Sequence, residues 1–91
     1  MAEIRVERSH ALGKEAALRA ALRVAERMKE KAQVDYRVNG DVIEFERTGA
    51  KGSLTVTEDR VIAEVKLGLM LKPMRGLVES KIDDYFTRYF V

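Results

Sequence analysis

His10 is the single histidine of the chain, and an imidazole can serve as a metal ligand or as a general base. A zinc site requires about three or four nitrogen, sulfur or carboxylate ligands, and the chain has no second histidine and no cysteine. A catalytic pair with Ser9 is disfavoured as well, because neighbouring residues of a strand point to opposite faces. We therefore predict no metal, no cofactor and no catalytic residue. We expect His10 to close the end of the first strand, with a binding role as the alternative.

Arg8 and Arg47 are the two arginines whose positions suggest a specific role. Arg8 has the same strand parity as the apolar residues before it, so it should face the interior, where a charge needs a partner. Strand directions traced along the chain bring Arg8 and His10 to one end of the sheet, beside Glu58. This predicts an ion pair between Arg8 and Glu58. The same tracing takes Arg47 to the opposite end, with residues 67–73, so candidate binding residues lie at two ends and argue against one composite active site.

Leu69, Met70 and Leu71 form an apolar run in a connection that should be polar. Pro73 follows, and it suits the first turn of a helix, where its missing N–H is not needed. At least one of the three side chains should reach the surface, because successive residues of an extended segment point in opposite directions. Closure of the core is the simpler interpretation. The sharper one is a small exposed patch for an apolar partner, and we predict the run as the main contact surface.

A row of cationic side chains recurs at every fourth residue of the first helical segment: Arg19, Arg23, Arg27 and Lys31. Like charges at this spacing repel one another, which would favour an anionic partner. Glu26 and Glu30 stand close enough to offset the repulsion, and no stacking aromatic residues accompany the row, as they would in a single-strand binder. A solvated face is therefore favoured over binding of nucleic acid or of an anionic surface.

The composition limits what these residues can do. With 91 residues, 46% of them apolar and 35% charged, the chain has room for one globular domain, residues 1–91. A domain of this size cannot hold a large internal cavity, so enzymes with deep pockets are disfavoured. The net charge of +2 is too small to indicate nucleic acid. No apolar run is long enough for a transmembrane segment and no secretory signal is present, so we expect a cytoplasmic protein.

Two periodicities alternate along the chain. Apolar residues at every second position predict strands, and apolar residues at spacings of three and four predict helices. The predicted order is one strand, a helix, four strands and a helix, over residues 4–7, 12–32, 34–38, 43–47, 54–56, 61–67 and 73 to the C-terminus. Asn39-Gly40 predicts the first hairpin turn and residues 49–52 the second. The last helix should present one apolar stripe from Met74 to Phe90.

An α+β fold follows, with the order β-α-β-β-β-β-α, in which about five antiparallel strands carry both helices on one face. In the expected strand order 2-3-4-5-1, the second strand lies at an edge, with Val34, Tyr36 and Val38 facing inward. Its short length and its outward Asp35 and Arg37 protect this edge only in part. A weak homodimer is therefore predicted.

Three short motifs fit a known pattern in their order and spacing: Glu7-Arg8-Ser9-His10 with Leu12-Gly13, then Phe45-Glu46-Arg47 with Gly49 and Lys51-Gly52, then Leu67-Gly68-Leu69-Met70-Leu71 with Pro73. Together they resemble the polyhydroxyalkanoic acid system proteins, a family of about this length encoded in the polyester-granule gene region of bacteria. The resemblance spans nearly the whole chain. It implies an association with polyhydroxyalkanoate metabolism and carries no catalytic residue to transfer.

The expected function is that of a non-enzymatic accessory protein, which binds a polyhydroxyalkanoate granule surface or a granule-associated protein. The alternative is a small carrier of hydrophobic ligands, because a sheet gripped by a C-terminal helix resembles a reduced helix-grip domain of the START kind. A carrier needs an apolar cavity under the last helix, whereas a surface binder needs an exposed apolar patch. An enzyme ranks third, because the sequence has neither a nucleophile with its base nor a phosphate-binding loop.

Overall fold

A computed structural model of the protein describes residues 2–90. Its elements, in chain order, are β1 (Ala2–Ser9), α1 (Gly13–Ala32), β2 (Asp35–Asn39), β3 (Val42–Arg47), β4 (Ala50–Val56), β5 (Arg60–Leu67), the 3-10 turn η1 (Lys72–Met74) and α2 (Arg75–Tyr89). All five strands belong to one antiparallel sheet of order β1-β5-β4-β3-β2. The predicted α+β class, element order and strand order are confirmed.

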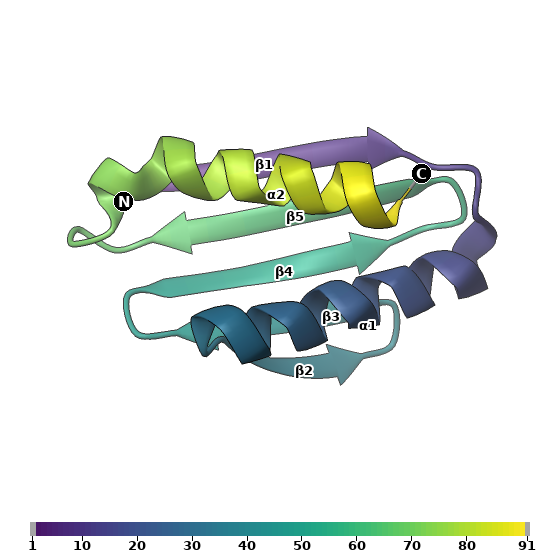
Figure 1. The fold of residues 1–91 in the computed structure, drawn as a ribbon, viewed down its shortest axis with the longest axis horizontal. Coiled ribbons are helices and arrows are strands. Elements are labelled where there is room, and N and C mark those ends of the chain that lie inside the picture. Colours follow the sequence, from purple (N-terminus) through teal and green to yellow (C-terminus); the bar gives the residue numbers. More distant parts are fainter. Residues whose placement is uncertain (1, 91) are drawn as a thin grey trace.

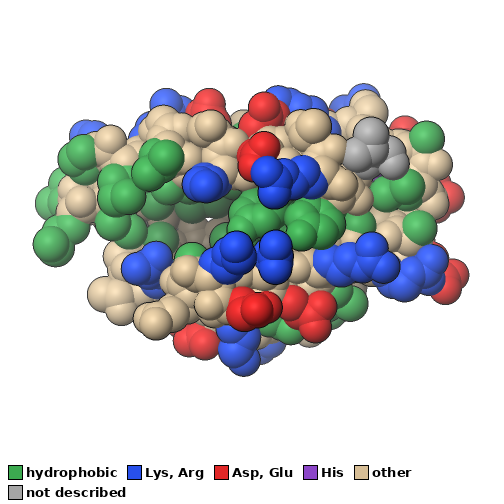
Figure 2. Space-filling view, in the orientation of Figure 1, with side chains coloured by type: hydrophobic (Ala, Val, Ile, Leu, Met, Phe, Trp, Pro, Cys, Tyr) green, Lys and Arg blue, Asp and Glu red, His purple; other side chains and the backbone are tan. Residues whose placement is uncertain are grey.

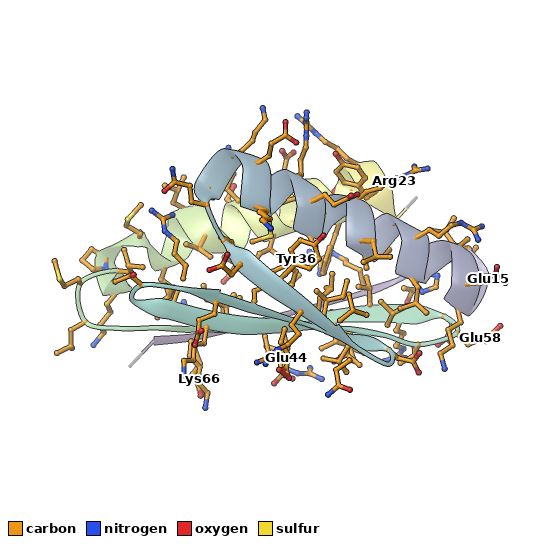
Figure 3. All side chains as sticks on the ribbon, turned by 90° about the horizontal axis from the view of Figure 1, so that it is seen from below. Glu15, Arg23, Tyr36, Glu44, Glu58 and Lys66 are labelled. Carbon is orange, nitrogen blue, oxygen red and sulfur yellow. The ribbon has the colours of Figure 1, made fainter. Side chains whose placement is uncertain are left out.

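Both helices cover the same face of the sheet (Figure 1). α2 lies along β1, while α1 contacts β4, β3 and β2, and the two helices touch each other. Seen along the plane of the sheet, the helices form one layer, and Glu44 and Lys66 project from the opposite face (Figure 3). The sheet therefore has one face packed on the core and one polar face, which is the arrangement that its alternating sequence predicts.

Small side chains bring α1 close to the sheet. Its buried residues are Ala17, Ala20, Ala21, Val24 and Ala25. Because alanine adds little beyond the helix backbone, this face can pack tightly against the inward side chains of the strands. The helix ends at Gln33, which adopts a left-handed conformation with φ 55°, and its N–H donates to the carbonyl of Lys29.

The core lies between the sheet and the two helices, and every strand except β2 supplies buried residues to it: Ile4, Val6, Ile43, Leu54, Val56, Val61, Ala63 and Leu67. Phe86 of α2 and Phe90, directly after the helix, are also buried in this core. The predicted apolar stripe of α2 is wrong at its beginning, because Met74 and Leu77 are exposed. Met74 ends the turn η1 and Leu77 lies in the first turn of α2, at the end of the molecule where the chain passes from β5 into the helix (Figure 1).

Both predicted hairpin turns shift in the structure. Asn39 pairs with Val42, so the first turn consists of Gly40 and Asp41, of which only Gly40 has a positive φ, 63°. The second turn is shorter than predicted, because the pairing of Arg47 with Ala50 leaves only residues 48–49 in the turn, and Gly49 has φ 85°.

Gly52 lies inside β4 and not in the turn where its type suggested it. A Cβ atom at this position would lie 3.0 Å from the carbonyl oxygen of Glu64 on β5, so the glycine permits a close approach of two strands. The sequence alone does not separate this role from that of a turn glycine.

The molecule is elongated, with principal extents of 37 × 21 × 20 Å. One end carries the β2–β3 and β4–β5 turns together with the connection from β1 to α1. The other end carries the β3–β4 turn and the connection from β5 to α2 (Figure 1). Within residues 2–90, no helix combines the length and the apolar character that crossing a membrane requires.

Candidate functional site

A tight turn displays Leu69 and Met70 at the end of the molecule. The N–H of Leu71 donates to the carbonyl of Gly68 at 3.1 Å, so these two residues close a β-turn whose central positions are Leu69 and Met70. Central turn positions are normally taken by polar residues or glycine. Here the two apolar side chains are 79% and 92% exposed.

Two residues farther along the chain extend this exposed surface. Met74 is 44% exposed and Leu77 is 55% exposed. Figure 2 shows hydrophobic side chains gathered at its left end, over the β5–α2 connection and the beginning of α2. We call the four exposed residues Leu69, Met70, Met74 and Leu77 the apolar tip. Four of the five large exposed apolar side chains among the described residues belong to it, the fifth being Val38.

Leu71 does not share the exposure of the two residues before it. Its side chain packs against the core, and a Cβ atom added at Gly49 would lie 3.3 Å from Leu71 Cδ1. The turn is also fixed at its beginning, because the N–H of Gly68 donates to the carbonyl of Gly49 at 2.8 Å. The predicted run of residues 69–71 therefore divides into two exposed side chains and one anchor.

Charged residues surround the base of the apolar tip. Arg47 lines an open groove of about 480 Å³ together with the turn residues 48–49, Gly68 and the acidic residues Asp35 and Glu46. On the opposite side, the guanidinium of Arg75 donates to the carbonyl of Glu3 at 3.2 and 3.3 Å. The prediction that Arg47 lies at the same end as residues 67–73 is confirmed.

His10 is buried at the other end of the molecule, where it joins β1 to the β4–β5 turn. Its Nδ1 accepts a hydrogen bond from the N–H of Leu12 at 3.2 Å, which puts the ring proton on Nε2. Nε2 lies 3.2 Å from the carbonyl oxygens of both Thr57 and Arg60 and donates to them. Both ring nitrogens are thus occupied by backbone groups, as expected for a residue that closes the end of the first strand.

Arg8 faces the helices as predicted, but its predicted partner is wrong. It forms an ion pair with Asp83 of α2, and its Nη1 also donates to the carbonyl of Glu7 at 2.9 Å. The inward parity assigned to Glu58 does not hold, because β4 ends at Val56 and the chain turns before it reaches Glu58. The Arg8–Asp83 pair lines an open groove of about 390 Å³ between β1 and α2.

The outer face of β1 and β5 carries a second charged pair at the same end. Glu7 accepts a hydrogen bond from Arg60, and this bond holds the pKa of the Glu7 carboxyl below its ordinary value. Arg5 adds to this effect from a distance of 3.0 Å. Arg5 and Arg60 are solvent-exposed and Glu7 is partly buried, so the pair stabilises the sheet edge only slightly.

The cationic row of α1 lies on the solvent side of the helix, as predicted. Arg19, Arg23, Arg27 and Lys31 are all exposed, and Arg19 contacts Glu15 at 3.2 Å. Arg23 projects from the layer of helices away from the sheet (Figure 3). None of the four residues lines either of the two open grooves described above.

Two members of the apolar tip escaped sequence reasoning. The spacing of Met74 and Leu77 matches the helical stripe, and this spacing predicts that both face the core. Gly68 is the signal in the sequence that indicates this exposed end, because a glycine directly after a strand, followed by apolar residues, indicates a turn at the end of the sheet. Within residues 2–90, no group of three or more acidic or histidine side chains is arranged to hold a metal ion.

Comparison with known proteins identifies a family. Residues 4–90 match the family model described as polyhydroxyalkanoic acid system protein, which covers nearly the whole chain and all five strands. No curated protein and no solved structure matches the chain. The three sequence motifs that resemble this family lie at both ends of the fold. Gly49, Gly68 and Leu71 support the apolar tip at one end. His10 closes the opposite end. The chain belongs to the polyhydroxyalkanoic acid system protein family.

Proposed function

We propose that this protein is a non-enzymatic accessory component of the polyhydroxyalkanoate system, and that it binds a granule surface or a granule-associated protein through its apolar tip. Membership of the family supports the connection with polyhydroxyalkanoate. The observation that carries the proposal is the exposure of Leu69 and Met70, at 79% and 92%, on a turn held by backbone hydrogen bonds.

Exposure of this kind is informative because the fold does not require it. The inward residues of β5, from Val61 to Leu67, already supply the core, and Leu71 closes it at the end of the sheet. The apolar tip therefore adds hydrophobic surface where a polar turn would fold equally well. Exposed apolar side chains that cluster at one place are typical of interaction sites.

The carrier alternative has less support. The space between α2 and the sheet holds the packed side chains of Phe86 and Phe90, whose rings meet edge to face at 5.4 Å. The two grooves described above are open to solvent and are bordered by charged residues. A ligand would need an apolar cavity in a region that aromatic side chains fill.

Co-sedimentation with purified granules tests the proposal. The variant Leu69→Ser/Met70→Ser removes the two most exposed apolar side chains without touching the core, and it should sediment much less than the wild-type chain. Val38→Ser is the matched control, because Val38 is an exposed apolar residue, 49% accessible, near the opposite end of the molecule. Undiminished sedimentation of the double variant, at unchanged stability, would rule out the apolar tip as the contact.

A further inference from the structure

We propose that the partner of the apolar tip is an anionic lipid surface, into which Leu69 and Met70 insert while neighbouring cations contact the negatively charged headgroups. This inference rests on the proposed function, because it assigns a chemistry to the surface that the same tip would meet. Its support comes from the shape of the tip, from its charge and from its rigidity.

The shape of the tip favours a deformable surface. Leu69 and Met70 occupy the central positions of a turn and therefore protrude from one end of a molecule 37 Å long. A protein partner would need a matching pocket for a convex turn. A lipid surface needs none, because apolar side chains can enter between headgroups and reach the boundary of the acyl chains.

The charge around the tip complements an anionic surface. Residues 65–78 contain Lys66, Lys72 and Arg75 and no acidic side chain, whereas acidic residues make up about one in six of the whole chain. Lys72 directly follows the turn and forms no ion pair within the described part of the chain. Cations beside an apolar insertion point are the combination that binds anionic lipid.

Three acidic residues also lie at this end, and two of them, Glu3 and Glu46, are paired with lysines. The Glu3 carboxylate lies 3.7 Å from the ammonium of Lys66, and the Glu46 carboxylate lies 3.5 Å from that of Lys51. Both pairs belong to the polar face of the sheet, from which Lys66 projects in Figure 3. Asp35 lies on the edge strand β2, separated from β5 by two strands.

The turn is also rigid enough to present both side chains together. The hydrogen bonds from Gly68 to Gly49, from Leu71 to Gly68 and from Met74 to Leu71 measure 2.8, 3.1 and 2.9 Å. Because these bonds fix the backbone on both sides of Leu69 and Met70, insertion requires no reordering of the loop. Less conformational entropy is then lost on binding.

Sedimentation with lipid vesicles tests this inference. The wild-type chain should bind vesicles of equal parts phosphatidylcholine and phosphatidylglycerol, and binding to phosphatidylcholine alone should be at least about tenfold weaker. Leu69→Ser/Met70→Ser should lose about tenfold or more of the affinity for the mixed vesicles, whereas Val38→Ser should bind as the wild-type chain does. Lys72→Glu should also weaken binding, in contrast to Arg23→Glu on the exposed face of α1.

A tryptophan probe distinguishes insertion from simple attraction of charges. The chain has no tryptophan, so Met70→Trp introduces a single reporter at the turn. Its emission should shift to shorter wavelength on addition of the mixed vesicles, while Val38→Trp should show no shift. Absence of a shift at Met70→Trp under conditions of full sedimentation would overturn the insertion.

The outcomes separate this inference from the proposed function. Binding of granules that depends on Leu69 and Met70, together with no binding to mixed vesicles, would overturn the lipid inference and leave the proposed function standing, with a protein or the polyester as partner. Equal binding to both vesicle types would overturn it as well. Binding of mixed vesicles through the tip, with granule sedimentation unaffected by the same substitutions, would support the lipid inference and contradict the proposed function.

Discussion

The N–H of Gly68 donates to the carbonyl of Gly49 at 2.8 Å, and this bond joins the β3–β4 turn to the loop that leads into α2. Two glycines far apart in the sequence thus form one platform. Leu71 packs on it from one side, which leaves Leu69 and Met70 to protrude from the other. The position of Leu69 and Met70 is therefore fixed by contacts between the β3–β4 turn and the β5–α2 connection.

The platform should be sensitive to a side chain at Gly49. Gly49→Ala introduces a Cβ at φ 85° and 3.3 Å from Leu71 Cδ1, whereas Gly40→Ala has the same type of backbone strain, at φ 63°, with open space around it. We expect a loss of about 1 to 2 kcal/mol of unfolding free energy for Gly40→Ala and a larger loss for Gly49→Ala. Urea denaturation of both variants measures the difference, and equal losses would show that the contact with Leu71 is unimportant.

His10 should stabilise the fold through its hydrogen bonds. His10→Phe keeps an aromatic ring near Phe90, whose centroid lies 6.2 Å from that of the imidazole, but it removes the hydrogen bonds of the ring to the N–H of Leu12 and to the carbonyls of Thr57 and Arg60. The Arg60 carbonyl keeps the N–H of Thr57 as a donor, at 2.9 Å. Leaving buried polar groups unpaired costs about 1 to 3 kcal/mol. Chemical denaturation should show a loss of this size. A variant as stable as the wild-type chain would mean that water replaces the imidazole.

Arg8 should be structural and only weakly stabilising. Its side chain and that of Asp83 are about half exposed, at 51% and 50%, so a double-mutant cycle with Arg8→Met and Asp83→Asn should give a coupling free energy of about 0.2 to 1 kcal/mol. Granule binding per folded molecule should stay unchanged in Arg8→Met. Loss of binding by a normally folded Arg8→Met variant would instead identify a site at this end of the molecule.

Weak self-association is expected through β2, which lies at an edge of the sheet. The strand has only five residues, and Val38 is exposed beside its unpaired backbone groups. Light scattering over a concentration series should show an apparent mass that rises with concentration. A strictly monomeric mass at millimolar concentration would refute the association.

Much of the fold follows from local patterns in the sequence. The alternation of Val61, Ala63 and Val65 and the Gly-containing turns predict the meander, because side chains in a strand change face at every residue. Contacts made after the chain turns are harder to predict. Alternation continued past the end of β4 predicts Glu58 as the partner of Arg8, whereas the true partner Asp83 depends on the rotation of α2 over β1.

The candidate site was likewise predictable where it depends on local sequence and not where it depends on contacts between distant segments. The apolar run at residues 69–71 is visible in the sequence, and so is the alternative that one of its members closes the core. Which side chain does so depends on the bond between Gly68 and Gly49, a contact between segments almost twenty residues apart. The exposure of Met74 and Leu77 depends on which side of η1 and of the first turn of α2 faces the sheet, and local spacing alone does not determine this.

The most direct test of the apolar tip is the single substitution Met70→Asp, followed by granule binding and thermal unfolding of the same preparation. Met70 is 92% exposed, so a carboxylate there meets water in the free protein and should leave the melting temperature unchanged. Burial of a methionine in an interface is worth about 1.5 to 3 kcal/mol, so the affinity for granules should fall at least about tenfold. Unchanged granule affinity at an unchanged melting temperature would contradict the account.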